Sequence, residues 1–464
     1  MKTTIKTATR GICFALGLLT ASSLAHAAGF AIYENDARGF AMANANVGRN
    51  DDASALYSNP AAITQLPGLQ IKAGLSFIMP SVDVSTWGSM KYTPVPGKTE
   101  TNPFYLAPGI ANPDTPNETT SMNSYTAIVP NLYVTYRIND DMAAGLSFHV
   151  PYGLKSDFQK EPASWPGAYN NFFTDVQSYQ ITPTFAYRLV HDQPWAKQIS
   201  VAAGISMFRF DITIKRQMAF ALLQDPTSPY DPGTNPFRAS GYTPLVLKGG
   251  TWKFGYNFAV QFEVNDQLAF GIVYRSGYSV KITGASAEII GMRPQVHNAW
   301  GKITLPDSWS FGVNYSPVVP LNLGFQALRT NWSSYNNLTM EPFPVAGVPA
   351  NPSITPKNWK DVWRYCFGAE YQYTNQVALR AGLVIDKDPV NPSLAEYMVP
   401  SNDRVLFSVG AGWTINKNLI IDFALGYIRI KGRHIDARPE AGVLKTFVHT
   451  GNAKIFSISG NYRF

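Results

Sequence analysis

The chain has 464 residues and a formal net charge of +7, with 13% aromatic and 15% charged residues. Lys2, Lys6 and Arg10 lie at the N-terminus, so the remainder carries +4 (7 minus 3), which is too little and too scattered to predict nucleic acid as a partner. An intrachain disulfide is excluded in the mature protein, because Cys13 lies in a segment that we expect to be removed and Cys366 then stands alone.

Residues 1–27 have the pattern of a signal peptide. The three cations precede the apolar run GICFALGLL, and AHA (Ala25–Ala27) has the small-x-small form that signal peptidase cuts. We therefore expect an exported protein whose mature chain begins at Ala28. Later segments lack the roughly eighteen uninterrupted apolar residues of a spanning helix, so a membrane span would have to consist of strands.

Residues 28–68 are rich in Ala, Gly and Asn and lack a strand pattern. They contain SNPAAITQLPG (Ser58–Gly68), in which Asn59 can cap a helix that begins at Pro60 and Ala61. The segment is too long for a tail and too apolar to stay disordered in water. We predict that it folds as a hatch inside the lumen of the barrel that the rest of the chain forms.

From residue 69 to residue 464, apolar and polar side chains alternate with a period of two in segments of about ten residues. In RVLFSVGAGWTIN and WKFGYNFAVQFEV one face is almost entirely apolar, and the opposite face is small or polar. The aromatic end KIFSISGNYRF resembles the last strand of bacterial outer-membrane barrels. Fourteen such segments begin near residues 69, 124, 142, 178, 198, 252, 268, 303, 321, 363, 376, 404, 419 and 454.

The spacers between these segments alternate between short turns and long Pro/Gly/Asn-rich stretches. Short periplasmic turns and long extracellular loops give this alternation, and bacterial barrels have an even number of strands. The long spacers centre on residues 87–123, 153–177, 217–251, 287–302, 340–360, 388–402 and 433–452. We predict an all-β protein, a 14-stranded antiparallel transmembrane β-barrel with an N-terminal hatch in its lumen, located in the bacterial outer membrane.

Several motifs resemble the FadL family of long-chain fatty acid transporters, and they occur in order along the mature chain. They are AGF (Ala28–Phe30), DDASALYSNPA (Asp51–Ala61), VPNLYVTYRIND (Val129–Asp140), PYGLKSDF (Pro151–Phe158), TLPDSWSFGVNY (Thr304–Tyr315), WKDVWR (Trp359–Arg364) and VPSNDR (Val399–Arg404). The resemblance implies a fourteen-stranded barrel that contains a hatch. It also implies uptake of a ligand from an extracellular apolar groove into an inner pocket, followed by hatch movement and lateral release through a kinked third strand.

The resemblance assigns gating roles to five residues. Asn59, Pro60 and Ala61 match the hatch motif, Gly153 matches the strand kink, and Asp386 matches an acidic residue near it. A glycine at the kink can adopt backbone angles that break strand pairing. The alternatives are a capped helix in a structural plug, a glycine that begins a loop, and an aspartate that makes structural hydrogen bonds.

The resemblance also assigns ligand contacts inside the barrel. Arg216 matches a basic residue that faces the ligand carboxylate, Lys357 is the Lys nearest to a second basic position, and Phe30 matches an aromatic residue that reaches the pocket. A cation beside the carboxylate removes the cost of burying an unpaired anion. Alternatively, Arg216 binds solvent or lipopolysaccharide phosphate at the rim, and Phe30 is an ordinary packed side chain.

Two long spacers, SWPGAYNNFF and QMAFALL, carry large apolar side chains, which on a surface usually mark a ligand or a partner. They suit an extracellular groove, unless the loops simply pack on each other. The residues expected to line the groove are Trp165, Phe172, Phe173, Met218, Phe220, Leu222 and Leu223.

We expect uptake of long-chain fatty acids by a monomer that sits in outer-membrane lipid and lipopolysaccharide and uses no cofactor or metal. The alternative ligand is an aromatic or alkane hydrocarbon, which has no carboxylate and so needs no Arg216. We do not expect an enzyme, because His149, His191, His297, His434 and His449 show no pattern of a membrane lipase. The hatch argues against an open porin.

Overall fold

The computed structural model describes residues 29–94, 106–158, 165–218, 243–289, 299–340 and 353–464. The expected signal peptide and the groove residues Phe220, Leu222 and Leu223 lie outside this part of the chain. No helix in the described residues is long and apolar enough to cross a membrane.

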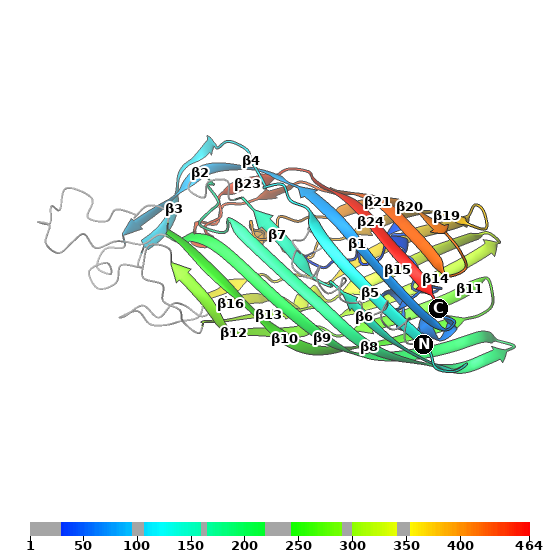
Figure 1. The fold of residues 1–464 in the computed structure, drawn as a ribbon. Helices are drawn as coiled ribbons and strands as arrows, with labels where there is room; N and C mark the ends of the chain where they lie inside the picture. Colours follow the sequence, from blue (N-terminus) through cyan, green and yellow to red (C-terminus); the bar gives the residue numbers. More distant parts are fainter. Residues whose placement is uncertain (1–28, 95–105, 159–164, 219–242, 290–298, 341–352) are drawn as a thin grey trace, which may run out of the picture.

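The wall is a closed antiparallel barrel (Figure 1). Over the described residues this wall has fourteen strands. The first strand pairs with the second on one side and with the last on the other, so the sheet has no free edge. In chain order the wall consists of β1 (Leu69–Ser81), β5 (Ala127–Arg137), β6 (Met142–His149) with β7 (Gly153–Asp157), β8 (Phe173–Gln193), β9 (Ala196–Met218), β10 (Thr243–Glu263), β11 (Leu268–Arg275) with β12 (Tyr278–Ile289), β13 (Ala299–Leu305) with β14 (Ser308–Val318), β15 (Leu321–Thr330) with β16 (Asn337–Met340), β17 (Ser353–Pro356) with β18 (Val362–Gln372), β19 (Val377–Asp386), β20 (Arg404–Thr414), β21 (Leu419–Ile430) and β24 (Gly451–Arg463).

The side chains alternate across the wall, as the sequence predicts. Phe254 and Phe407 point outward and are 74% and 56% exposed, whereas Gln261 and Ser408 point into the lumen and are 1% and 3% exposed. This pattern places apolar side chains against lipid and polar ones inside. The predicted barrel is confirmed.

Part of the predicted loop region is instead sheet. A second, five-stranded sheet is made of β2 (Asp83–Pro94), β3 (Leu106–Pro116), β4 (Thr120–Ser121), β22 (Arg433–Ile435) and β23 (Lys445–Val448). It extends from the end of the barrel opposite the C-terminus (Figure 1). The prolines of β3 argue against a strand, but pairing with β2 over most of its length outweighs this local preference.

The described parts of the long connections also contain the short 3-10 helices η2 (Trp332–Ser334), η3 (Pro392–Leu394) and η4 (Pro439–Ala441).

Residues 29–68, here called the hatch, lie within the barrel and contain α2 (Ala37–Ala41), α3 (Ala55–Ser58) and η1 (Pro60–Gln65). Helix α2 contacts β19, β20 and β21, whereas η1 contacts β8, β9 and β10, so the hatch reaches across the lumen. Wall glycines let its backbone approach closely, since a Cβ atom on Gly324 would lie only 1.8 Å from the carbonyl oxygen of Ala45.

Candidate ligand path through the barrel

The third wall strand is interrupted at residues 150–152, between β6 and β7. The ladder between β5 and β6 ends at the pair Leu132–Phe148, and among the described residues β7 is paired only with β8. The interruption lies just before Gly153, which is itself paired with Gln177. Gly153 thus keeps its pairing with β8, and its expected role at the kink stays a prediction.

The hatch supplies backbone partners at this third-strand break. Ile32 donates its N–H to the carbonyl of Pro151 at 2.9 Å, and Gly153 donates its N–H to the carbonyl of Phe30 at 2.8 Å. These bonds flank an isolated antiparallel bridge between Ala31 and Tyr152. Residues 30–32, here called the closing segment, thus act as a short strand that replaces part of the missing ladder beside the third wall strand.

The side chain of Asn35 completes this replacement. Its Oδ1 accepts the N–H of Val150 at 3.1 Å, and its Nδ2 donates to the carbonyl of Val150 at 3.1 Å. The hydroxyl of Tyr133, from β5, donates to the carbonyl of Asn35 at 2.7 Å. The hatch therefore satisfies backbone groups of Val150 and Pro151 at the break, whereas Ser178 of β8 satisfies those of Tyr152.

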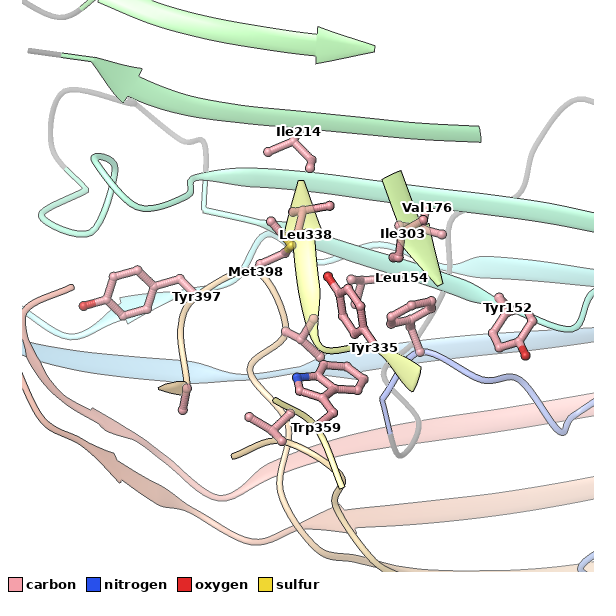
Figure 2. Close-up of a cluster of buried hydrophobic side chains, with 14 of the residues drawn as sticks. Tyr152, Leu154, Val176, Ile214, Ile303, Tyr335, Leu338, Trp359, Tyr397 and Met398 are labelled. Carbon is pink, nitrogen blue, oxygen red and sulfur yellow. The ribbon is translucent and has the colours of Figure 1, made fainter. Parts of the chain in front are cut away.

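Phe30 lies in a cluster of aromatic side chains, here called the aromatic cluster: Phe30, Tyr152, Trp332, Tyr335 and Trp359. Its ring centroid is 5.0 Å from that of Trp332, 5.8 Å from those of Tyr152 and Trp359, and 6.2 Å from that of Tyr335. Figure 2 shows Tyr335 and Trp359 beside Leu338 and Met398, within a larger apolar region that Leu154, Ile214 and Ile303 also enter. The start of the hatch is therefore part of the main apolar core of the lumen.

The loop aromatics are packed rather than arranged along an open groove. Trp165 is 3% exposed, stacks on Phe158 at a centroid distance of 4.7 Å and contacts Tyr397. Phe172 is 1% exposed, and Phe173 is partly buried at the start of β8. Met218 is the last residue of β9. Trp165 and Phe172 are covered, as in the alternative that the loops pack on each other, and their role in a ligand groove stays a prediction.

The two expected ligand cations differ in their surroundings. Lys357 is buried and forms an ion pair with Glu396, so its charge is already balanced. Arg216 lies near the end of β9, and its buried Nε has no hydrogen-bond partner among the described residues. Glu396 also interacts electrostatically with Arg216. Arg216 is therefore better placed than Lys357 to take an additional anion.

Asp386 forms part of a buried ion triad across three adjacent strands. It is in register with Arg364 on β18 and with Arg404 on β20, and its Oδ2 lies 2.8 Å from Nη1 of Arg364 and 2.9 Å from Nε of Arg404. The guanidinium of Arg364 stands 4.2 Å from the ring centroid of Tyr33 in the hatch. Asp386 thus fixes a cation that packs against the hatch near the third-strand break.

Asn59 both caps η1 and connects it to the wall. Its Oδ1 accepts the N–H of Ala61 at 3.1 Å, and its Nδ2 donates to the carbonyls of Val47 at 2.8 Å and Val260 at 3.1 Å. Pro60 and Ala61 are buried, and Ala61 is fully enclosed. The helix start that the sequence suggested is present, and it is also a contact with β10.

A cavity of about 90 Å³, here called the central cavity, lies between the hatch and the wall. Pro151 and Tyr152 of the third-strand break line it, as do Tyr57 of the hatch and Arg275 of β11. Among its described lining residues there is no Asp or Glu. The described chain has no group of three His, Cys, Asp or Glu side chains that could hold a metal ion.

Sequence reasoning missed Arg275 and Arg364 of the central cavity, and also Lys72. A signal was available, because Lys72 follows Gln70 and precedes Ser76 on the buried face of β1. Arg275 likewise lies two residues after the buried Val273. Charged residues on the lumen face of a barrel strand are the pattern that could have identified them.

Lys72 is the centre of an ion cluster that joins the hatch to the wall. Its Nζ lies 2.6 Å from Asp36, 2.8 Å from Asp52 and 3.4 Å from Asp422. Lys72 and Asp422 belong to the wall, whereas Asp36 and Asp52 belong to the hatch.

Arg38 makes a second connection of the same kind. Its guanidinium binds both carboxylate oxygens of Glu370, at 3.1 and 2.9 Å. Arg380 then connects Glu370 to Asp422, at 2.5 and 2.7 Å. Hatch and wall therefore share one continuous set of buried ion pairs.

The comparisons with known proteins cover nearly the whole chain. The family model described as outer membrane protein transport protein (OMPP1/FadL/TodX) matches residues 18–464. The long-chain fatty acid transport protein of Escherichia coli O6:H1 is 25% identical over 477 residues, which cover 97% of each chain.

Solved structures show the same fold. A FadL homologue of Pseudomonas aeruginosa has a TM-score of 0.74 at 20% identity, and the match covers 94% of this chain and 99% of that one. The Pseudomonas putida toluene transporter TodX has a TM-score of 0.63 at 14% identity, with the same coverage. The chain therefore belongs to the OMPP1/FadL/TodX family of outer-membrane proteins that transport hydrophobic compounds.

Proposed function

We propose that this protein takes up long-chain fatty acids across the outer membrane and releases them sideways through the third-strand break. The observation that carries the proposal is that residues 30–32 of the hatch close this break with backbone hydrogen bonds. A movement of this short segment would open the wall without unfolding the barrel. Release into the membrane suits a ligand that is poorly soluble in water.

The apolar core of the lumen supports the first part of this path. Phe30 belongs both to the aromatic cluster and to the segment that closes the break. A fatty acyl chain that displaced Phe30 from the cluster would therefore disturb the closing segment directly. We infer that binding and opening are coupled through this residue.

Arg216 favours an acid over a hydrocarbon as the ligand. A carboxylate in an apolar region needs a cation or hydrogen-bond donors, and Arg216, near the outer end of the lumen, offers an Nε without a partner among the residues that the structure describes. The second candidate is an aromatic hydrocarbon, favoured by the many aromatic side chains of the lumen core. Wild-type uptake of a fatty acid, compared with uptake of an aromatic hydrocarbon and of an alkane of the same length as the acid, distinguishes an acid ligand from a hydrocarbon.

We propose that the protein transports its ligand without a catalytic step, as a monomer surrounded by outer-membrane lipid and lipopolysaccharide. We propose Arg216 and Phe30 as ligand contacts, and Asn59, Pro60, Ala61, Gly153 and Asp386 as residues that hold the hatch and the break in place.

The test is a reversible cross-link between the hatch and the break. Ala31→Cys and Tyr152→Cys, introduced together in a Cys366→Ala background, place a disulfide across the isolated bridge. We expect oxidation to reduce fatty acid uptake to background and a reducing agent to restore it. Uptake is measured in whole cells with labelled ligand.

A matched control cross-links two wall residues that have no part in opening. Leu321 and Tyr371 are paired across β15 and β18 and serve this purpose. Their disulfide should leave uptake unchanged. Normal uptake with the Ala31–Tyr152 pair fully oxidised would show that the closing segment need not move.

A further inference from the structure

Arg275 is a partly buried cation, and no carboxylate in the part of the chain that the structure describes balances its charge. Among the described residues, no Asp or Glu oxygen lies within 4.0 Å of its guanidinium, whereas Arg364, which lines the same cavity, is paired with Asp386. Arg275 donates to the carbonyl of Tyr57 and stands 5.7 Å from the centroid of that ring. A carbonyl and a ring face offset only part of the cost of burying a guanidinium.

A second polar group beside Arg275 also lacks a partner. His149, the last residue of β6, is 4% exposed, and its Nδ1 has no hydrogen-bond partner among the described residues. Its ring meets the ring of Tyr57 edge-on at 5.3 Å. Arg275, Tyr57 and His149 therefore form a row along the central cavity.

The position of this row relates it to the third-strand break. Ala31 and Ile32 of the closing segment, the adjacent Tyr33, and Pro151 and Tyr152 of the break line the same central cavity. A group bound at Arg275 would thus lie in the space that the closing segment separates from the membrane. The charges that line the cavity are positive, which favours an anion.

We propose that Arg275, with Tyr57 and His149 beside it, forms a second carboxylate site, where the head group of the ligand is held before lateral release. This inference rests on the proposed function, since it requires an amphiphile with a single carboxylate. Arg216 would hold the head group near the outer end of the lumen, and Arg275 would hold it beside the break. The His149 ring would donate a hydrogen bond to the second carboxylate oxygen.

The experiment compares a long-chain fatty acid with its methyl ester, which has the same chain and no charge. Arg275→Met removes the cation but retains much of the length of the side chain. We expect affinity and uptake of the fatty acid to fall roughly tenfold or more, as for a lost charge-assisted hydrogen bond. Binding and uptake of the methyl ester should be unchanged. Equal losses for both ligands would overturn the proposal, because they would show that Arg275 only supports the hatch.

Two further variants test whether the effect of Arg275→Met is due to the lost charge at this position. Arg275→Lys retains the charge and should restore most of the discrimination between acid and ester. Arg329→Met removes a partly exposed cation that is paired with Asp361 on another part of the barrel. This control variant should bind and take up both the fatty acid and its methyl ester as the wild type does. Failure of Arg275→Lys to restore any preference for the acid would also count against the proposal.

Brominated fatty acid in crystals of the full-length protein locates the sites directly. We expect anomalous density for a chain whose carboxylate lies within hydrogen-bond distance of Arg275 in the central cavity. Density with the head group only at Arg216, together with an unchanged acid preference in Arg275→Met, would refute the second site and leave the proposed function standing. A wild-type protein that takes up no fatty acid at all would refute the proposed function itself.

Discussion

Three basic side chains of the lumen differ in what balances their charges. Lys357 has Glu396 and Arg364 has Asp386, whereas within the described residues Arg275 has a backbone carbonyl and an aromatic ring but no carboxylate. An unpaired buried charge costs several kcal/mol of free energy. Lys357 and Arg364 avoid this cost, because a carboxylate of the protein already balances each of their charges. A ligand carboxylate gains most at the cation that lacks one.

The side chain of Asn59 has two roles, which are to cap η1 and to connect η1 to the wall. Substitutions at this position can separate the two roles. Asn59→Ser keeps an oxygen that can accept the N–H of Ala61 but loses the amide donors to Val47 and Val260. Asn59→Ala loses both, including about 1 kcal/mol of capping. We expect both variants to form barrels with unchanged resistance to denaturant and to show similarly reduced uptake. Normal uptake in the Ser variant alone would assign the effect to the cap.

At the level of elements, the hatch is fixed to the wall in two different ways. The closing segment is attached by a few backbone hydrogen bonds and the amide of Asn35, whereas the part that contains α2 is attached by buried ion pairs. Burial alone would raise the pKa of the Asp52 carboxyl, but Lys72 and Arg38 outweigh burial and hold that pKa below its usual range. The ion cluster should keep the centre of the hatch in place while the closing segment moves.

Lys72→Met tests the strength of this attachment. The variant leaves Asp36, Asp52 and Asp422 close together without their common cation, and breaking such a buried set costs roughly 3–5 kcal/mol. We expect faster proteolysis and hydrogen exchange in the hatch, with the barrel still resistant. The matched control is Lys454→Met, which changes an exposed lysine of β24. In this variant the rates of proteolysis and hydrogen exchange in the hatch should equal those of the wild type. Unchanged hatch protection in Lys72→Met would contradict the role of the cluster.

At the scale of the whole molecule, the barrel wall should fold independently of the hatch, and the two contact each other inside the lumen. The wall closes through β1, which pairs with both β5 and β24, and these contacts involve no hatch residue. The hatch fills a lumen that a barrel of this size would otherwise leave open. The wall should therefore form without the hatch, but it should not hold back ions.

Deletion of residues 37–66 tests this separation. We expect the deletion variant to remain a folded barrel in detergent and to show large, steady conductance in planar bilayers, with only small conductance in the intact protein. The folded state is checked by protease resistance of the wall. A large conductance of the intact protein would favour an open porin, and a deletion variant that stays closed would show that the hatch is not the barrier.

Much of the fold could be predicted from the sequence because its signals are local. Alternation over about ten residues identifies each strand and its outward face, as for Phe254 and Phe407, and the absence of alternation identifies the hatch. The second sheet was missed, since β3 contains prolines and is stabilised mainly by its partner strand.

The sequence by itself determined the number of wall strands, their faces, and the presence of a segment that cannot be wall. Only the tertiary structure decided which lumen charges are paired, where the third strand is interrupted, and what closes that interruption. The physical reason is distance along the chain: Lys72 meets Asp422, and Ile32 meets Pro151, only after the barrel has closed around the hatch. Composition and period describe each strand, but the choice of ion-pair partners across a lumen depends on the closed barrel.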